Sequence, residues 1–269
     1  MGRKSGPKQG RTLPLLCGVL TSLAICGCGG FWDEVRSNNF EISHLFIKPN
    51  PLLVLKESTD GDERARALAT LHEPKQVGGT DQEQDFVVQV LVTAASSERQ
   101  PWCRLKAIGS LGRFQDPRAV KGLEDAYYKA STFPAETAHA IRVQAITALG
   151  NTKNPDALPI LIRFVRQKPV EGSEQEKREN LDERIAAAHA LGNFNQYQAT
   201  EALTVVLQDT KDVALRDSAH ASLKTITGKD FPPDHAAWEE FLHQNAGKDT
   251  IEREQGPLEK VAGWFSLGD

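Results

Sequence analysis

The stretch RVQAITALG, residues 142–150, contains the pattern that decides the fold. An alanine follows its arginine by three positions and a leucine by seven, and the same spacing recurs in four other places. The five arginines are Arg64, Arg104, Arg142, Arg184 and Arg216, separated by 40, 38, 42 and 32 residues. A helical unit repeated at this interval is typical of a solenoid, in which each repeat packs only on its neighbours.

The repeated positions suit packed helices. The alanine lets neighbouring helices approach closely, and the leucine fills the core from the same helix face. In three repeats a glycine follows the leucine (Gly112, Gly150 and Gly192), and we expect it to adopt the left-handed conformation that ends a helix. We predict that the five arginines are structural, each guanidinium pairing with an acid or a carbonyl group of the adjoining repeat.

The spacing continues into a second helix. In the middle three repeats an alanine lies fifteen residues after the arginine and a leucine lies nineteen residues after it. Asp116–Pro117 and Asn154–Pro155 each place a capping side chain before a proline, which is a signal for the start of a helix. The third copy, QYQAT from Gln196, has neither signal.

This pattern resembles the HEAT repeats of bacterial proteins, and the resemblance covers residues 62–241. It implies an all-α fold, a right-handed α-solenoid of about five HEAT-like helical-hairpin repeats. Asn50 and Pro51 predict an N-terminal capping helix, and residues 81–96 predict the second helix of the first repeat. Trp238, Phe241 and Leu242 recur on one face of a closing helix, which would cover the end of the core.

Two segments depart from the helical pattern. Residues 168–180, KPVEGSEQEKREN, supply the extra length behind the 42-residue spacing, and we expect a solvated, mobile loop. Residues 245–256 have the composition of a polar linker. After this linker, Leu258, Val261 and Phe265 recur at helical spacing in the tail, beside Trp264. The tail would either fold back on the solenoid or serve as a docking peptide.

The N-terminus has the layout of a secretory signal. A cationic segment precedes an apolar stretch, residues 12–25, which is too short to span a bilayer comfortably. Its end resembles a bacterial lipobox, with Ile25 and Gly27 before Cys28, so we predict that Cys28 is lipidated. Cys26 is the weaker candidate because bulky Ile25 precedes it, and a signal without lipidation is the alternative. The signal and repeats together resemble a group of HEAT-repeat lipoproteins.

These observations divide the chain into four parts. We assign residues 1–27 to a lipoprotein-type signal peptide, 28–49 to a tether and N-terminal segment, 50–244 to the solenoid, and 245–269 to a linker and tail. The protein would then be exported and attached to a membrane of the cell envelope through its lipid. Without the four cations of the signal, the net charge falls from −4 to −8. So acidic a domain argues against nucleic acid as a partner.

The sequence shows no catalytic or metal-binding constellation. No two of the seven histidines stand four apart on one helix, as a zinc pair would. The step His72–Glu73 is similar to the iron-binding steps of HEAT-type deoxyhypusine hydroxylases, but the equivalent positions in the next repeats hold Gly–Arg and Gly–Asn pairs. We therefore expect no metal, no cofactor and no enzymatic activity. HEAT-like bilin lyases are the alternative, and they would need a pocket with placed acids.

The remaining expectation concerns the outward residues of the second helices. In the second repeat these are Lys121, Asp125 and Tyr128, and in the third Arg163 and Arg166. A tyrosine among cations is a frequent feature of protein-binding surfaces. We therefore predict a scaffold or protein-binding module that contacts its partner through a few residues. The candidate residues are Lys121, Tyr128, Arg163, Arg166, Trp264 and Phe265.

Overall fold

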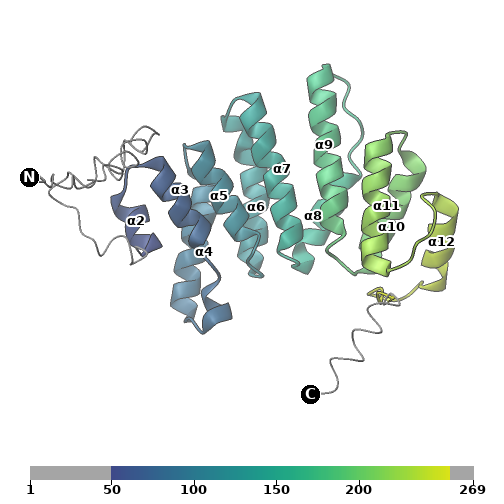
Figure 1. Ribbon diagram of the computed structural model, residues 1–269, viewed down its shortest axis with the longest axis horizontal. Coiled ribbons are helices and arrows are strands. Elements are labelled where there is room, and N and C mark those ends of the chain that lie inside the picture. The colour runs from purple at the N-terminus through teal and green to yellow at the C-terminus, as the bar shows by residue number, and fades with distance from the viewer. Residues whose placement is uncertain (1–49, 255–269) are drawn as a thin grey trace, which may run out of the picture. The chain divides into compact units, whose positions relative to one another are not determined.

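A computed structural model describes residues 50–254, and this part of the chain is an α-solenoid (Figure 1). Its α-helices are α2 (Pro51–Glu57), α3 (Gly61–Thr70), α4 (Asp81–Ser97), α5 (Pro101–Leu111), α6 (Pro117–Lys129), α7 (Ala135–Asn151), α8 (Leu158–Val165), α9 (Glu174–Leu191), α10 (Tyr197–Asp209), α11 (Val213–Thr227) and α12 (His235–Gln244). Short 3₁₀ helices lie at η2 (Pro74–Val77), η3 (Ala130–Thr132) and η4 (Pro155–Ala157). The all-helical solenoid expected from the repeat is confirmed.

The helices pair into five hairpins that follow one another along the array (Figure 1). The first helices of the hairpins are α3, α5, α7, α9 and α11, and each packs against the next. The second helices are α4, α6, α8, α10 and α12, and α4 packs on α6 while α10 packs on both α8 and α12. Helix α2 packs on α3 at the N-terminal end, as expected of a capping helix.

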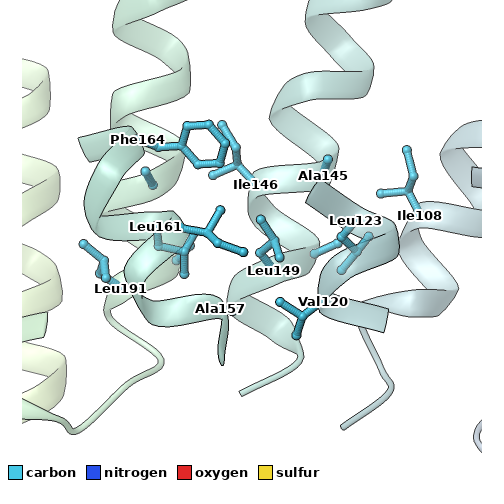
Figure 2. Packing of buried hydrophobic residues seen from close by; sticks show 14 of the residues in the cluster. Ile108, Val120, Leu123, Ala145, Ile146, Leu149, Ala157, Leu161, Phe164 and Leu191 are labelled. Carbon is cyan, nitrogen blue, oxygen red and sulfur yellow. The ribbon is translucent and has the colours of Figure 1, made fainter. Parts of the chain in front are cut away.

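The repeated alanines and leucines form the core. Ala107, Ala145 and Ala187 are fully buried, as are the leucines four residues after each of them. The second-helix positions behave in the same way, with Leu123 and Leu161 fully buried. Figure 2 shows Leu123, Leu149 and Leu161 pointing toward one another from neighbouring helices. The core is therefore continuous along the array, because each hairpin buries its apolar side against the next.

The glycine that follows the repeated leucine has a different role from the expected one. Gly112 and Gly192 are right-handed, with φ of −61° and −60°, and Gly150 lies inside α7. The reason for glycine is space. A Cβ at Gly150 would lie 2.6 Å from the Cβ of Ala190 in the next first helix, closer than side chains approach. The glycine therefore sets how closely successive first helices pack.

Helix starts follow the sequence signals where those signals exist. The side chains of Asn50, Asp116 and Asn154 accept hydrogen bonds from backbone N–H groups at the starts of α2, α6 and η4. These bonds satisfy donors that the first turn of a helix leaves unpaired. Gln196 before α10 provides no such bond.

The segment predicted as a loop is partly helical. Residues 166–173 connect α8 and α9, but α9 begins at Glu174 and includes the second half of the segment. Ser173 and Glu176 form a capping box, in which each side chain accepts a hydrogen bond from the other residue's backbone N–H. The prediction of a loop through Asn180 was wrong because the acidic and basic residues are good helix formers once this cap is in place.

The segment predicted as a polar linker also packs on the solenoid over its described part. Ile251 is buried, and its N–H donates to the carbonyl of Asn195. Gln196 and Thr250 form an antiparallel bridge, and the N–H of Tyr197 donates to Asp249. Residues 249–251 thus replace the missing side-chain cap of α10. Composition could not reveal this, because the contacts are made by backbone groups and by one apolar side chain.

The closing helix was predicted correctly. In α12 the ring of Trp238 is fully buried and Leu242 nearly so, while Phe241 packs on the edge of the core. The Nε1–H of Trp238 donates to the carbonyl of Pro232, so the polar end of this buried ring is satisfied.

Candidate functional site

The repeated arginines lie at the junctions between hairpins. Arg104 is the most enclosed, with 3% of its surface exposed. Its guanidinium donates to the carbonyls of Ser96, Glu98 and Lys129 at 2.9–3.2 Å and lies 4.6 Å from the centre of the Phe133 ring. Burial lowers the pKa of Arg104 below its usual range. The carbonyl groups at the ends of α4 and α6 stabilise the charge together. Because α4 belongs to the first hairpin and Arg104 to the second, these hydrogen bonds connect the two hairpins.

Arg64 and Arg142 pair with carboxylates instead. Arg64 donates to Glu98 at 2.7 Å and to the carbonyl of Leu55 in the capping helix. Arg142 in α7 donates to Glu183 at 2.6 Å and to Glu179 at 3.0 Å, both in α9. These contacts place an ion pair between the third and fourth hairpins.

The last two arginines have fewer partners. Arg184 makes one hydrogen bond, 3.5 Å long, to the carbonyl of Val165. Burial lowers the pKa of Arg184. Arg216 is half-buried, and within residues 50–254 its guanidinium has no side-chain hydrogen bond or ion pair. The arrangement of partners thus differs from repeat to repeat although the arginine position is the same.

Glu183 is a buried acid at a position where three of the other four repeats place apolar side chains, while the first has the exposed Glu63. It precedes the arginine of its repeat, as Cys103, Ile141 and Leu215 precede theirs, and those three residues are fully buried. Only 7% of the Glu183 side chain is exposed. A buried carboxylate is costly unless charges and donors compensate it. Sequence reasoning missed this residue, although comparison of the repeats one position before the arginine would have found it.

The compensation comes from two neighbouring helices, α6 and α7. Tyr127 of α6 donates its hydroxyl to Glu183 at 2.6 Å, and Arg142 binds the other carboxylate oxygen. Burial and the Glu183 carboxylate both raise the pKa of Tyr127 above its usual range. His139 of α7 lies at the edge of this group, with its Nε2 3.3 Å from Asp182. We call Tyr127, His139, Arg142, Glu179 and Glu183 the central acid cluster.

The central acid cluster borders a cavity. A hollow of about 400 Å³ is lined by Tyr127, Arg142, Glu179 and Glu183 together with the connection between α8 and α9. The Nδ1 of His139 is buried without a hydrogen-bond partner, 3.9 Å from Glu183. A phenol, an imidazole and a carboxylate at this spacing are groups that can accept or donate a proton. The cluster therefore gathers ionisable side chains of α6, α7 and α9 beside a cavity.

The second helices form another surface, which carries the binding residues expected from the sequence. Ion pairs cross it from helix to helix: Arg118 of α6 with Asp85 of α4 at 2.6 Å, and Arg163 of α8 with Glu124 of α6 at 2.6 Å. A third joins Arg166, just after α8, to Glu201 of α10 at 3.6 Å. We call the exposed side of α4, α6, α8 and α10 the second-helix face.

The expected binding residues on this face fall into two groups. Arg163 and Arg166 are engaged with acids of the neighbouring hairpins. Tyr128 is 55% exposed, with its ring edge-on to Tyr127 at 5.1 Å between centres. Lys121 is exposed and borders a shallow groove between α4 and α6. The structure thus leaves Tyr128 and Lys121 available and holds the two arginines in place.

In the His72–Glu73 pair, the glutamate makes structural hydrogen bonds. Glu73 is 7% exposed and accepts hydrogen bonds from the side chains of Gln76 and Gln84 and from the N–H of Gln115. It therefore joins the first two hairpins. Within residues 50–254 no group of three or more His, Cys, Asp or Glu side chains is arranged to hold a metal ion.

Three predicted site residues lie outside the described residues: Cys28 and the tail aromatics Trp264 and Phe265. The fourth cysteine, Cys103, is buried and reduced, with its thiol 3.2 Å from the carbonyl of Gly61. In the part of the chain that the structure describes, none of the helices is both long and apolar enough to cross a bilayer.

The fold and the repeated junctions define the class of protein, an α-solenoid of helical hairpins. A model of the PBS lyase HEAT-like repeat family matches residues 141–167, which run from α7 through η4 and α8. Residues 141–167 are therefore similar to a HEAT-like repeat, as the sequence pattern indicates. No curated protein matches the chain.

Proposed function

We propose that this protein is a non-catalytic scaffold that binds a protein partner on its second-helix face. The observation that carries the proposal is the row of ion pairs across α4, α6, α8 and α10, which fixes the helices while Tyr128 stays exposed beside them. An exposed tyrosine on a rigid surface loses little conformational freedom on binding, which favours affinity.

The binding face is tested by co-purification. We expect Tyr128→Ala with Lys121→Glu to lose a partner that co-purifies with the full-length protein from solubilised membranes. Trp102→Ala is the matched control, because Trp102 is an equally exposed aromatic on the first helix α5. Equal loss with both variants, or retention with both, would contradict the assignment of the second-helix face.

Attachment to the cell envelope belongs to the same proposal. Support comes from the sequence alone, through Ile25 and Gly27 before Cys28. An acylated Cys28 would hold the solenoid at a membrane surface and limit its search for partners to that surface. Mass spectrometry of the membrane-extracted protein should find Cys28 as the acylated N-terminal residue. An N-terminus at Cys26, or an unmodified one, would contradict it.

The central acid cluster favours a second candidate, a cofactor-handling enzyme of the bilin-lyase kind. Such an enzyme needs a pocket with placed acids, and Glu179 and Glu183 border a cavity beside Tyr127. The matched family is also named for a lyase. If this candidate is correct, a linear tetrapyrrole should change its absorbance spectrum when it is titrated with the full-length protein. The Glu183→Gln variant should abolish this change. An unchanged spectrum would contradict the enzyme candidate, and the non-catalytic scaffold would remain as the proposed function.

A further inference from the structure

The connection between α8 and α9, drawn in Figure 1 as a long loop, leaves a cavity beside Arg184. The cavity has a volume of about 910 Å³ and lies between this connection, α9, and the end of α10. Its formation follows from the extra residues of the fourth repeat. Helix α8, which precedes Arg184, has 8 residues, whereas α4, which precedes Arg104, has 17, so the chain leaves the array early.

Arg184 is short of partners in this space. The guanidinium carries five N–H donors in a fixed fork, and here it makes a single hydrogen bond of 3.5 Å. At the equivalent position Arg104 donates to three carbonyls, and Arg142 binds two carboxylates. Asp212 lines the same cavity and its charge acts on Arg184, but its carboxylate makes no hydrogen bond to the guanidinium and accepts the N–H of Leu215 as the cap of α11. Most donors of Arg184 therefore have no acceptor within the described chain.

The charges around the cavity favour an anion, because its lining has five cations and two acids, Asp209 and Asp212. The cations besides Arg184 are Arg166, Lys168, Lys177 and Lys211. Arg166 and Lys177 pair with glutamates outside it, Glu201 and Glu174. Among residues 50–254 no acid pairs with Lys168 or Lys211. Two lysines at the mouth and a partly buried arginine inside would stabilise a carboxylate by charge-assisted hydrogen bonds.

Part of the remaining lining is apolar, which narrows the kind of anion that the cavity would bind. Val165, Val170, Leu181 and Val205 border the cavity beside Arg184. A small inorganic anion would leave these side chains facing water. A peptide with acidic residues among apolar ones would meet both the cations and the valines.

We propose that the cavity at Arg184 binds an acidic, partly apolar segment of a partner protein, with a carboxylate of that segment on the Arg184 guanidinium. The proposal rests on the scaffold function and names the chemistry of its partner. The cavity adjoins the second-helix face at Arg166, but Tyr128 and Lys121 do not line it.

The test is a fluorescence anisotropy titration of the full-length protein. The probe is a short labelled peptide of aspartates alternating with leucines, and its control has asparagines in place of the aspartates. We expect saturable binding of the aspartate peptide, weakened by salt. Lys168→Met with Lys211→Met should weaken it by about tenfold, the loss expected for a charge-assisted contact, and Arg184→Met should weaken it further. Arg178→Met on the exposed side of α9 is the matched control and should change nothing.

The outcomes separate the inference from the scaffold function. Equal binding of the two peptides, or full affinity in the lysine variant, overturns the inference; the lysines are exposed, so that variant tests it even if Arg184→Met fails to fold. Binding of anionic lipid vesicles in place of the aspartate peptide also overturns it. Suppose that a partner still co-purifies with the lysine variant but not with the Tyr128 variant. That result would support the scaffold function and contradict a role of the cavity in binding this partner.

Discussion

Arg104 and Arg142 occupy the same position of successive repeats, yet their charges are compensated in different ways. Arg104 is surrounded by backbone carbonyls, whereas Arg142 is held by two glutamates of the next hairpin. The first arrangement depends on where helices end, and the second on side chains forty residues away. The repeat motif therefore predicts the arginine, whereas the neighbouring residues determine which groups accept its hydrogen bonds.

The largest effect is expected at Arg104. Replacing it with alanine removes the donors of three enclosed carbonyls and leaves a gap under Phe133, so Arg104→Ala should lower the free energy of unfolding by about 3 kcal/mol. Urea denaturation followed by circular dichroism measures this. Arg99→Ala, at an exposed arginine before the same helix, should cost less than about 0.5 kcal/mol. Equal effects would show that the carbonyl contacts contribute little.

A double-mutant cycle sharpens the comparison at Arg142. Arg142→Met alone leaves Glu183 buried with Tyr127 and without its main cation, so we expect a loss of about 2 kcal/mol. Glu183→Leu introduces an apolar side chain, as three of the other four repeats have at this position. The double variant should therefore be more stable than the sum of the two single losses predicts. If the losses of the two single variants simply add, Arg142 and Glu183 have no interaction energy, and the ion pair does not couple the two hairpins.

The smallest effect is expected at Arg184. Because its guanidinium makes one long hydrogen bond, Arg184→Met should change the free energy of unfolding by less than about 1 kcal/mol. The same denaturation experiment measures it beside Arg104→Ala. A loss as large as that at Arg104 would show that Arg184 is a structural residue like the others, in conflict with a role in binding.

Much of the fold was predictable because it rests on short-range patterns. The spacing of alanine and leucine gave the hairpins and their buried faces, and Asn50, Asp116 and Asn154 marked helix starts. Two errors have a common cause. The start of α9 and the packing of residues 249–254 depend on a capping box and on backbone pairing, which leave little trace in hydrophobic composition.

The site was less predictable. The sequence located the arginines but not their partners, because the partners are carbonyls or residues in another repeat. Tyr127 lies beside the predicted Tyr128, but it is partly buried and its hydroxyl donates to Glu183. Arg163 and Arg166 looked available on the helix surface, and only the structure shows the glutamates that hold them. Helical spacing tells which face a residue occupies, and the neighbouring repeat decides whether it is free.

The bridge between Gln196 and Thr250 has a consequence for how the array opens. Terminal repeats of a solenoid have one neighbour and therefore fray more easily than internal ones. Here residues 249–251 attach to the start of α10, and the N–H of Glu254 donates to Thr227 at the end of α11. The fourth and fifth hairpins are thereby joined by a return of the backbone as well as by side-chain packing. Amide hydrogen exchange should find these two hairpins opening as one cooperative unit, with the N–H of Tyr197 exchanging at the rate of α11.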